Sequence, residues 1–378
     1  MSEARVNNLS NESNTGGPTI SGITTFSSPY FFVPPKGDTA SRPENPQKGS
    51  IRFNTDSKHL EYYRGDAIGW VEIEATNDEL DGGTRGIWSG GANWSAASPY
   101  NTAVIDAANL ASGGTAIDFG DNTSARRNGG QCGSRIRALL AGGYTSSRVN
   151  TIDYITFSST GDAVDFGDRT TIGTAVAGAS SSTRGVWHGA NTPTATNIID
   201  YITIASTGDA VDFGDATNTN NNNGSFSSTT RGVFGANGPS GAVDYVTIAT
   251  TGNAQDFGDF HLGRREVPGS GSNATRGIFA GGEAQPAGAY SNTISYNAIA
   301  TLGTFQDFGD LLSVRAGMGG AASPTRLAFA GGSNPSNPSG LNTIEYVQIL
   351  TTGNSVDFGD LTAVKNSYQG TSNGHGGL

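Results

Sequence analysis

The chain has 378 residues and a formal net charge of −11, with 22 Lys and Arg residues against 33 Asp and Glu residues. This acidic balance disfavours nucleic acids and anionic membranes as partners. The single cysteine, Cys132, excludes an internal disulfide, and no apolar run approaches the ~20 residues of a membrane-spanning helix.

Residues 1–36 are predicted to form an extended N-terminal arm. The first 16 residues are rich in Asn, Ser and Gly and offer almost no apolar side chains to bury. Residues 20–33 are β-prone and aromatic, and Pro34 and Pro35 end this segment. The first five residues lack the apolar stretch of a secretory signal, so we expect synthesis in a cytoplasm.

Residues 37–83 are predicted to form a small β module. Ile51, Phe53, Leu60 and Tyr62 alternate with polar residues, which predicts a hairpin with one apolar face, too small to be stable alone. The phrases Ile-Arg-Phe-Asn-Thr-Asp, Leu-Glu-Tyr-Tyr and Trp-Val-Glu-Ile resemble the small β module of tail-fibre and other virion structural proteins of tailed bacteriophages. The resemblance implies a joint between an attachment arm and a distal domain. It also implies self-association, with a trimer as one form; the alternative is docking on the rest of the chain.

The remainder, residues 84–378, is built from an internal repeat. The sequence Asp-Phe-Gly-Asp occurs six times, 44 to 51 residues apart, beginning at Asp118, Asp165, Asp212, Asp256, Asp307 and Asp357. Each repeat has the pattern of four short strands, and a Gly-Asp or Gly-Asn pair before the fourth strand is typical of a tight hairpin. Four-stranded repeats of about 40 to 50 residues indicate the blades of a β-propeller.

The predicted fold class is therefore all-β: a six-bladed β-propeller preceded by the small β module and the extended arm. The Gly-Gly or Gly-Ala pair after the second strand and the aromatic third strand resemble those of kelch-type propellers. Phrases such as Thr-Arg-Gly-Val and Thr-Ile-Asp-Tyr-Ile-Thr resemble structural proteins of phages that infect marine cyanobacteria. The first repeat begins at its second strand, and residues 364–373 align with the first strands of other repeats. We therefore expect the C-terminal strand to complete the first blade and close the ring.

One arginine recurs in each repeat and matches the recurrent aspartate one for one, at Arg85, Arg137, Arg184, Arg231, Arg276 and Arg326. This pattern predicts partly buried charge-assisted contacts between the two sets. The alternative is a ring of carboxylates that binds calcium, which takes about six to eight oxygen ligands, although the tight Asp spacing of a calcium loop is missing. We expect neither a metal nor a cofactor, while calcium binding stays open.

The loop between the second and third strands differs most from repeat to repeat. Loops held by a rigid scaffold are where recognition usually lies. Four aromatic residues of these loops, Trp94, Tyr100, Tyr144 and Tyr290, are candidate binding residues because flat amphipathic rings suit sugars and protein partners. The alternative is ordinary packing of each ring within its own loop.

Together these features predict a virion structural protein, a tail-fibre, whisker or capsid-fibre subunit located in the virion. By the resemblance, the arm contacts other virion proteins and the propeller binds a host-surface glycan or protein, or a neighbouring virion protein. No repeat carries a nucleophile, base and orienting group that the others lack, so we expect no enzymatic activity. Two alternatives stay open, a polysaccharide-degrading appendage enzyme and a purely architectural decoration.

Overall fold

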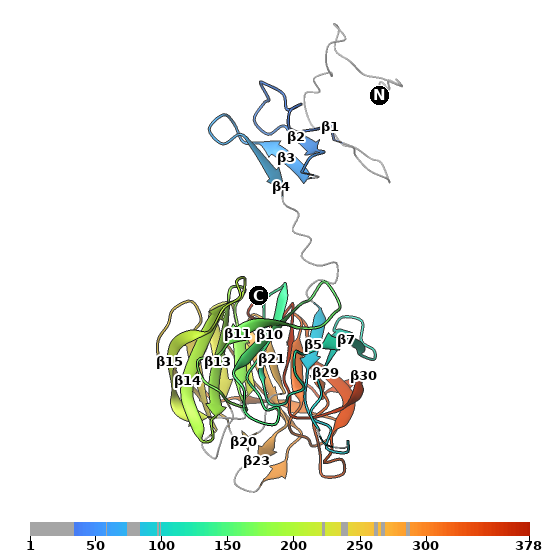
Figure 1. The fold of residues 1–378 in the computed structure, drawn as a ribbon, viewed down its shortest axis with the longest axis vertical. Coiled ribbons are helices and arrows are strands. Elements are labelled where there is room, and N and C mark those ends of the chain that lie inside the picture. The colour runs from blue at the N-terminus through green and yellow to red at the C-terminus, as the bar shows by residue number, and fades with distance from the viewer. Residues whose placement is uncertain are drawn as a thin grey trace. The chain divides into compact units, whose positions relative to one another are not determined.

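A computed structural model describes residues 34–57, 59–73, 84–96, 98, 100–220, 224–235, 241–260, 264–265, 269–284 and 288–378. Strands and turns, and no helix, make up this part of the chain, which confirms the all-β prediction (Figure 1). No helix that could span a membrane is found among these residues. The chain divides into two compact units, Met1–Asn77 and Asp78–Leu378. Most of the predicted arm, residues 1–33, lies outside the described residues.

The first unit contains one four-stranded sheet in the order β1, β2, β3, β4. The strands are β1 (Lys36–Gly37), β2 (Ile51–Asn54), β3 (His59–Tyr63) and β4 (Trp70–Ile73). β1 pairs with β2 in parallel, and the other pairs are antiparallel.

The two faces of this sheet differ in polarity. Glu61 is fully buried and accepts hydrogen bonds from Arg42 at 2.5 Å and from Asn54 at 3.3 Å. The hydrogen bond from Arg42 lowers the pKa of Glu61. On the opposite face, Ile51 is 53% exposed and Leu60 is 38% exposed. The predicted apolar face therefore exists and is exposed, whereas the polar face is buried by other residues of the same module.

The second unit contains one four-stranded antiparallel sheet for each sequence repeat, named here repeat sheets 1 to 6 (Figure 1). Repeat sheet 1 contains β31 (Gly370–Ser372), β5 (Arg85–Ser89), β6 (Val104–Asn109) and β7 (Ile117–Asp121). Repeat sheet 2 contains β8 (Gly130–Gly133), β9 (Arg137–Ala141), β10 (Thr151–Thr156) and β11 (Val164–Asp168). Repeat sheet 3 contains β12 (Ala177–Ser180), β13 (Arg184–Asn191), β14 (Ala195–Thr203) and β15 (Val211–Asn220).

The other repeat sheets have the same strand order. Repeat sheet 4 contains β16 (Gly224–Ser227), β17 (Arg231–Gly235), β18 (Ala242–Thr247) and β19 (Gln255–Asp259). Repeat sheet 5 contains β21 (Ser270–Ser272), β22 (Arg276–Ala280), β25 (Thr293–Ala298) and β26 (Gln306–Asp310). Repeat sheet 6 contains β27 (Gly319–Ala322), β28 (Arg326–Ala330), β29 (Leu341–Gln348) and β30 (Val356–Lys365). A small sheet is formed by β20 (Arg264–Arg265), β23 (Glu283–Ala284) and β24 (Ala289–Tyr290).

The first strands of the repeat sheets lie against one another. Each contacts the first strands of the preceding and following repeat sheets, and β27 of repeat sheet 6 contacts β31 of repeat sheet 1. Serine hydroxyls join these strands: Ser180 donates to the carbonyl of Gly133, and Ser225 donates to that of Gly178, both at 2.7 Å. Between the first strands lies a cavity of about 40 Å³ lined by small and polar residues, including His375.

The Asp-Phe-Gly-Asp motif docks each fourth strand on the next repeat sheet. Its phenylalanine is buried in every copy, at Phe119, Phe166, Phe213, Phe257, Phe308 and Phe358. Its glycine has a positive φ, +148° at Gly120, where a Cβ would collide with the carbonyl oxygen of Gly161 in the next repeat sheet. Gly161 in turn donates its N–H to the carbonyl of Phe119 at 2.8 Å. The motif therefore recurs because each copy makes the same contact between sheets.

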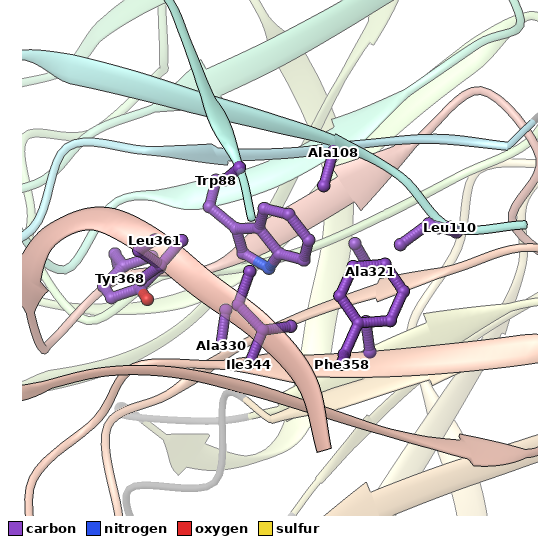
Figure 2. Close-up of a cluster of buried hydrophobic side chains, with 11 residues drawn as sticks. Trp88, Ala108, Leu110, Ala321, Ala330, Ile344, Phe358, Leu361 and Tyr368 are labelled. Carbon is purple, nitrogen blue, oxygen red and sulfur yellow. The ribbon is translucent and has the colours of Figure 1, made fainter. Parts of the chain in front are cut away.

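The apolar core is divided among the interfaces between consecutive repeat sheets. Each buried cluster combines residues of two neighbouring repeat sheets. Figure 2 shows the cluster between the last and the first, where Ile344 and Phe358 of repeat sheet 6 pack with Trp88 and Leu110 of repeat sheet 1. Tyr368, which precedes β31, is buried in the same cluster. The C-terminal segment thus joins repeat sheet 1 to repeat sheet 6.

Candidate functional site

The repeat sheets have two distinct ends. At the turn end, short turns join the third strand to the fourth and, in repeat sheets 2 to 6, the first strand to the second. At the loop end, the second strand leads into the third through the variable loop. Residue 84 enters β5 at the turn end, and β5 leads to the loop end at Ser89. The chain therefore enters β5 at the turn end, and the variable loops lie at the other end.

The loop end brings three of the four predicted aromatic residues together. The rings of Trp94 and Tyr100 lie 5.2 Å apart between centroids, and each residue is 40% exposed. The guanidinium of Arg127 lies over the rings of Trp94 and Tyr144, 4.7 Å and 4.5 Å from their centroids. These four residues, Trp94, Tyr100, Arg127 and Tyr144, are named here the Trp94 cluster. Arg127 is the member that the sequence did not indicate.

Hydrogen bonds from three repeat sheets hold the Trp94 cluster in place. The indole nitrogen of Trp94 donates to Oδ1 of Asn366 at 2.9 Å. Asn101 donates through Nδ2 to the carbonyl of Tyr144 at 2.8 Å and accepts from Nη1 of Arg127 at 2.7 Å. Fixed side chains lose little conformational freedom on binding, so the cluster is preorganised to contact a ligand.

Burial also affects the electrostatics of this cluster. Desolvation lowers the pKa of Arg127, which lies between two rings, although a guanidinium stays charged at neutral pH. No carboxylate forms an ion pair with Arg127 among the described residues. Exposed aromatic faces beside a guanidinium and an amide can stack on a ring and hydrogen-bond to its substituents.

Tyr290, the fourth predicted binding residue, lies elsewhere. It belongs to β24, where it pairs with Glu283 of β23 in the small three-stranded sheet. That sheet extends the variable loop of repeat sheet 5. Tyr290 therefore makes a suitable comparison residue for the Trp94 cluster.

Five of the six recurrent arginines form no ion pair with a recurrent aspartate among the described residues, contrary to the pairing that the sequence suggested. Arg137, Arg184, Arg231, Arg276 and Arg326 each donate to a main-chain carbonyl of the next repeat sheet. Each also lies over the tyrosine of its own third strand, as Arg231 does over Tyr245 at 4.7 Å. Arg85 donates to the carbonyl of Phe157. The first aspartate of every Asp-Phe-Gly-Asp copy is exposed to solvent. The fourth strand is the outer edge of its sheet, so this aspartate faces water and the arginine bonds to nearer carbonyls.

A different set of buried carboxylates recurs in the third strand. The pairs are Asp106 with Lys365, Asp153 with Arg126, Asp200 with Arg169, Asp244 with His188 and Glu345 with Arg315. In repeat sheet 5 the position is Ser295, which accepts from Nη2 of Arg264 at 3.4 Å. The signal in the sequence was a charged residue between two apolar residues, as in Ile152, Asp153 and Tyr154. No cluster of His, Cys, Asp or Glu suited to a metal ion occurs among the described residues.

No family model matches the chain, and no curated protein matches it. The functional conclusion therefore depends on the residues and the geometry above.

Proposed function

We propose that the protein is a virion appendage subunit, a tail-fibre, whisker or capsid-fibre component, whose repeat sheets form a six-bladed kelch-like β-propeller that binds a host surface. The binding acts by adhesion, without covalent chemistry or a cofactor. Binding to a neighbouring virion protein is the other use of the same surface. The phage-like phrases of residues 42–73 support the virion assignment.

The propeller is supported by three observations. The first strands contact one another in sequence order and back to the start. The apolar clusters join repeat sheets in the same order, including the last with the first. Gly370 and Ser372 of β31 pair with Trp88 and Gly86 of β5. A radial arrangement of blades accounts for all three.

The observation that carries the binding function is the Trp94 cluster at the loop end. It presents the exposed rings of Trp94 and Tyr100 at the opposite end of the repeat sheets from residue 84, where the chain arrives. Aromatic anchors on a rigid scaffold are common in binding surfaces.

Adsorption of the purified protein to host cells tests this function. We expect saturable adsorption that falls at least tenfold in Trp94→Ala and in Tyr100→Ala. The matched control is Tyr290→Ala, another loop tyrosine outside the Trp94 cluster, which should adsorb normally. Absence of adsorption by the intact protein would favour an architectural role, and release of sugars from host envelope glycan would favour an enzyme.

We also propose that the β module mediates self-association, with the N-terminal arm contacting other virion proteins. Cross-strand pairing of Ile51 with Tyr62 and of Phe53 with Leu60 places these apolar residues on one face. An exposed apolar face of this kind is typical of an interaction site. Leu60→Lys should shift the full chain toward the monomer in light scattering, while Glu72→Lys, on the other face, should not.

A further inference from the structure

We propose that the Trp94 cluster binds an acidic saccharide, with a sugar ring stacked on Trp94 or Tyr100 and its carboxylate or sulfate group bound by Arg127. This inference rests on the proposed binding function and names the chemical class of the ligand.

Arg127 is a cation with N–H donors that form no hydrogen bond within the described residues. Within the described residues the one hydrogen bond of its guanidinium runs from Nη1 to Oδ1 of Asn101, at 2.7 Å. A guanidinium has about five N–H donors in a planar fork that matches a carboxylate or sulfate. Four buried cations of the second unit, Arg126, Arg169, Arg315 and Lys365, pair with carboxylates, whereas the buried Arg264 donates to Ser295. Arg127 lacks a carboxylate partner in the described part of the chain, so an anionic ligand group would supply the missing charge.

Arg148 adds a second cation beside the same tyrosine. Tyr144 forms isolated β-bridges with both Arg127 and Arg148. Nη2 of Arg148 donates to Oδ1 of Asn191 at 3.1 Å, and its Nε is buried without a hydrogen-bond partner. Two arginines without carboxylate partners among the described residues, in a chain with a net charge of −11, make a local positive surface. A chain of several acidic sugars is long enough to meet both.

The exposed rings favour a saccharide over a bare anion. The indole of Trp94 is held by its hydrogen bond to Asn366, and its ring and that of Tyr100 are inclined by 42°. These rings offer apolar faces of the size of a pyranose, whose C–H groups stack on aromatic faces. Inorganic anions lack such a surface. The combination of stacking rings and a guanidinium that has no carboxylate partner among the described residues therefore fits a sugar ring that carries a negative group.

Calorimetric titration of the full chain with three probes of equal length tests the proposal. The probes are a carboxylated oligosaccharide (oligogalacturonate), a sulfated dextran oligomer and a neutral dextran oligomer. We expect at least one acidic probe to bind tenfold or more tighter than the neutral one, with affinity falling as salt rises. Preference between the two acidic probes identifies the anionic group.

Variants of Arg127 test how its positive charge and its planar guanidinium each contribute to the affinity for acidic probes. Arg127→Gln should lose the acidic preference by tenfold or more, and Arg127→Lys should retain part of it because it keeps the charge without the planar fork. Arg135→Gln is the control, since Arg135 is exposed at the turn end and its loss changes the net charge equally. Unchanged circular dichroism and melting temperature of Arg127→Lys would show that folding is intact.

Equal affinity for acidic and neutral probes would overturn this inference, as would an acidic preference that survives in Arg127→Gln. In either case, binding that depends on Trp94 would leave the proposed function standing. Binding of none of the three probes would also overturn the inference. The proposed function would then depend on host-cell adsorption, which is measured independently of any saccharide.

Discussion

The interface between repeat sheets 6 and 1, the closing interface, differs from the interface between repeat sheets 1 and 2 in how far apart its residues lie in the chain. At the internal interface, Asp153 accepts a hydrogen bond from Thr123, 30 residues away. At the closing interface, Asp106 accepts the equivalent bond from Thr362, across 256 residues. The same chemical contact is therefore made by near neighbours in one place and by the two ends of the unit in the other.

The two interfaces also share the same backbone hydrogen bond, with nearly equal lengths. Gly161 donates to Phe119 at 2.8 Å internally, and Gly114 donates to Phe358 at 2.9 Å at the closing interface. What differs is the entropy of closing the loop, about 2 kcal/mol by the logarithmic dependence on loop length. The comparison teaches that both interfaces have the same local contacts, although the closing interface brings together residues from the two ends of the second unit.

Truncation after Asp360 should have the largest effect, because it removes β31 and the closing contacts of Leu361, Lys365 and Tyr368. Burial of Leu361 and Tyr368 alone contributes about 2–3 kcal/mol each. We expect a loss of more than about 5 kcal/mol of unfolding free energy, measured by urea denaturation. An unchanged midpoint and an unchanged denaturant slope would show that the closing interface does not support the fold.

The buried cations at the two interfaces allow a direct comparison. Lys365 pairs with Asp106 at the closing interface, and Arg126 pairs with Asp153 internally. Removing one partner leaves a buried charge, so Lys365→Met and Arg126→Met should each cost about 3–5 kcal/mol. Urea denaturation of both variants should give values within about 1 kcal/mol of each other. A large cost at only one of the interfaces would contradict their equivalence.

Acid should weaken the C-terminal segment before the internal interfaces. His375 lies at the turn end, where its Nε2 is 2.9 Å from the carbonyl of Gly133, and burial lowers its pKa to about 4. A folded-state pKa below the ordinary value means that this contribution is full above pH ~6.5 and is lost as pH falls toward 4. The loss amounts to about 3 kcal/mol.

Melting temperatures at pH 7, 5.5 and 4 measure this effect. His375→Gln should show a shallower decline than the unmodified chain over that interval. His59→Gln, a change at an exposed histidine of the first unit, should leave the decline as it is. An identical decline in all three proteins would assign the acid sensitivity to other groups.

The periodic features of the fold were predictable from the sequence. The Phe and Gly of each Asp-Phe-Gly-Asp copy recur because each fills the same core position or close approach, so the period alone indicated four-stranded repeats. The partners of the charged residues were not predictable in the same way. A main-chain carbonyl, such as that of Ile299 for Arg231, leaves no mark on the sequence. The buried cations also have no fixed distance from the repeat motif. Arg126 follows Asp121, the last residue of its Asp-Phe-Gly-Asp copy, by five residues, whereas Arg169 follows Asp168 directly.

The candidate site was predictable in part. Trp94, Tyr100 and Tyr144 were singled out as aromatic residues in variable loops. The sequence did not indicate that Arg127, from the segment before β8, would lie between two of them. Nor did it place Tyr290 in a separate sheet. Both facts depend on how loops of different repeat sheets meet in space, which no local pattern encodes.

The smallest effect is expected at the turn end, where Arg231 of repeat sheet 4 and Arg326 of repeat sheet 6 make equivalent contacts. Arg231 donates to the carbonyl of Ile299 at 2.8 Å, and Arg326 donates to the equivalent carbonyl of Leu110 at 3.1 Å, and also to that of Ala111, across the closing interface. Either arginine changed to Met should cost about 1–2 kcal/mol, since the hydrogen bonding of the guanidinium to main-chain carbonyls and one contact with a ring are lost.

A double-mutant cycle assigns the energy of Arg231 to its partners. Coupling with Tyr245→Leu should be about 0.5–1 kcal/mol, because the guanidinium lies over that ring. Coupling with Asp256→Asn should be close to zero, because that aspartate is exposed and forms no ion pair with Arg231 among the described residues. A coupling above about 1 kcal/mol with Asp256 would restore the pairing suggested by the repeat pattern. Ion pairs would then stabilise the turn end, and their contribution to the free energy of unfolding would fall as salt rises. Hydrogen bonds to main-chain carbonyls would not show this salt dependence.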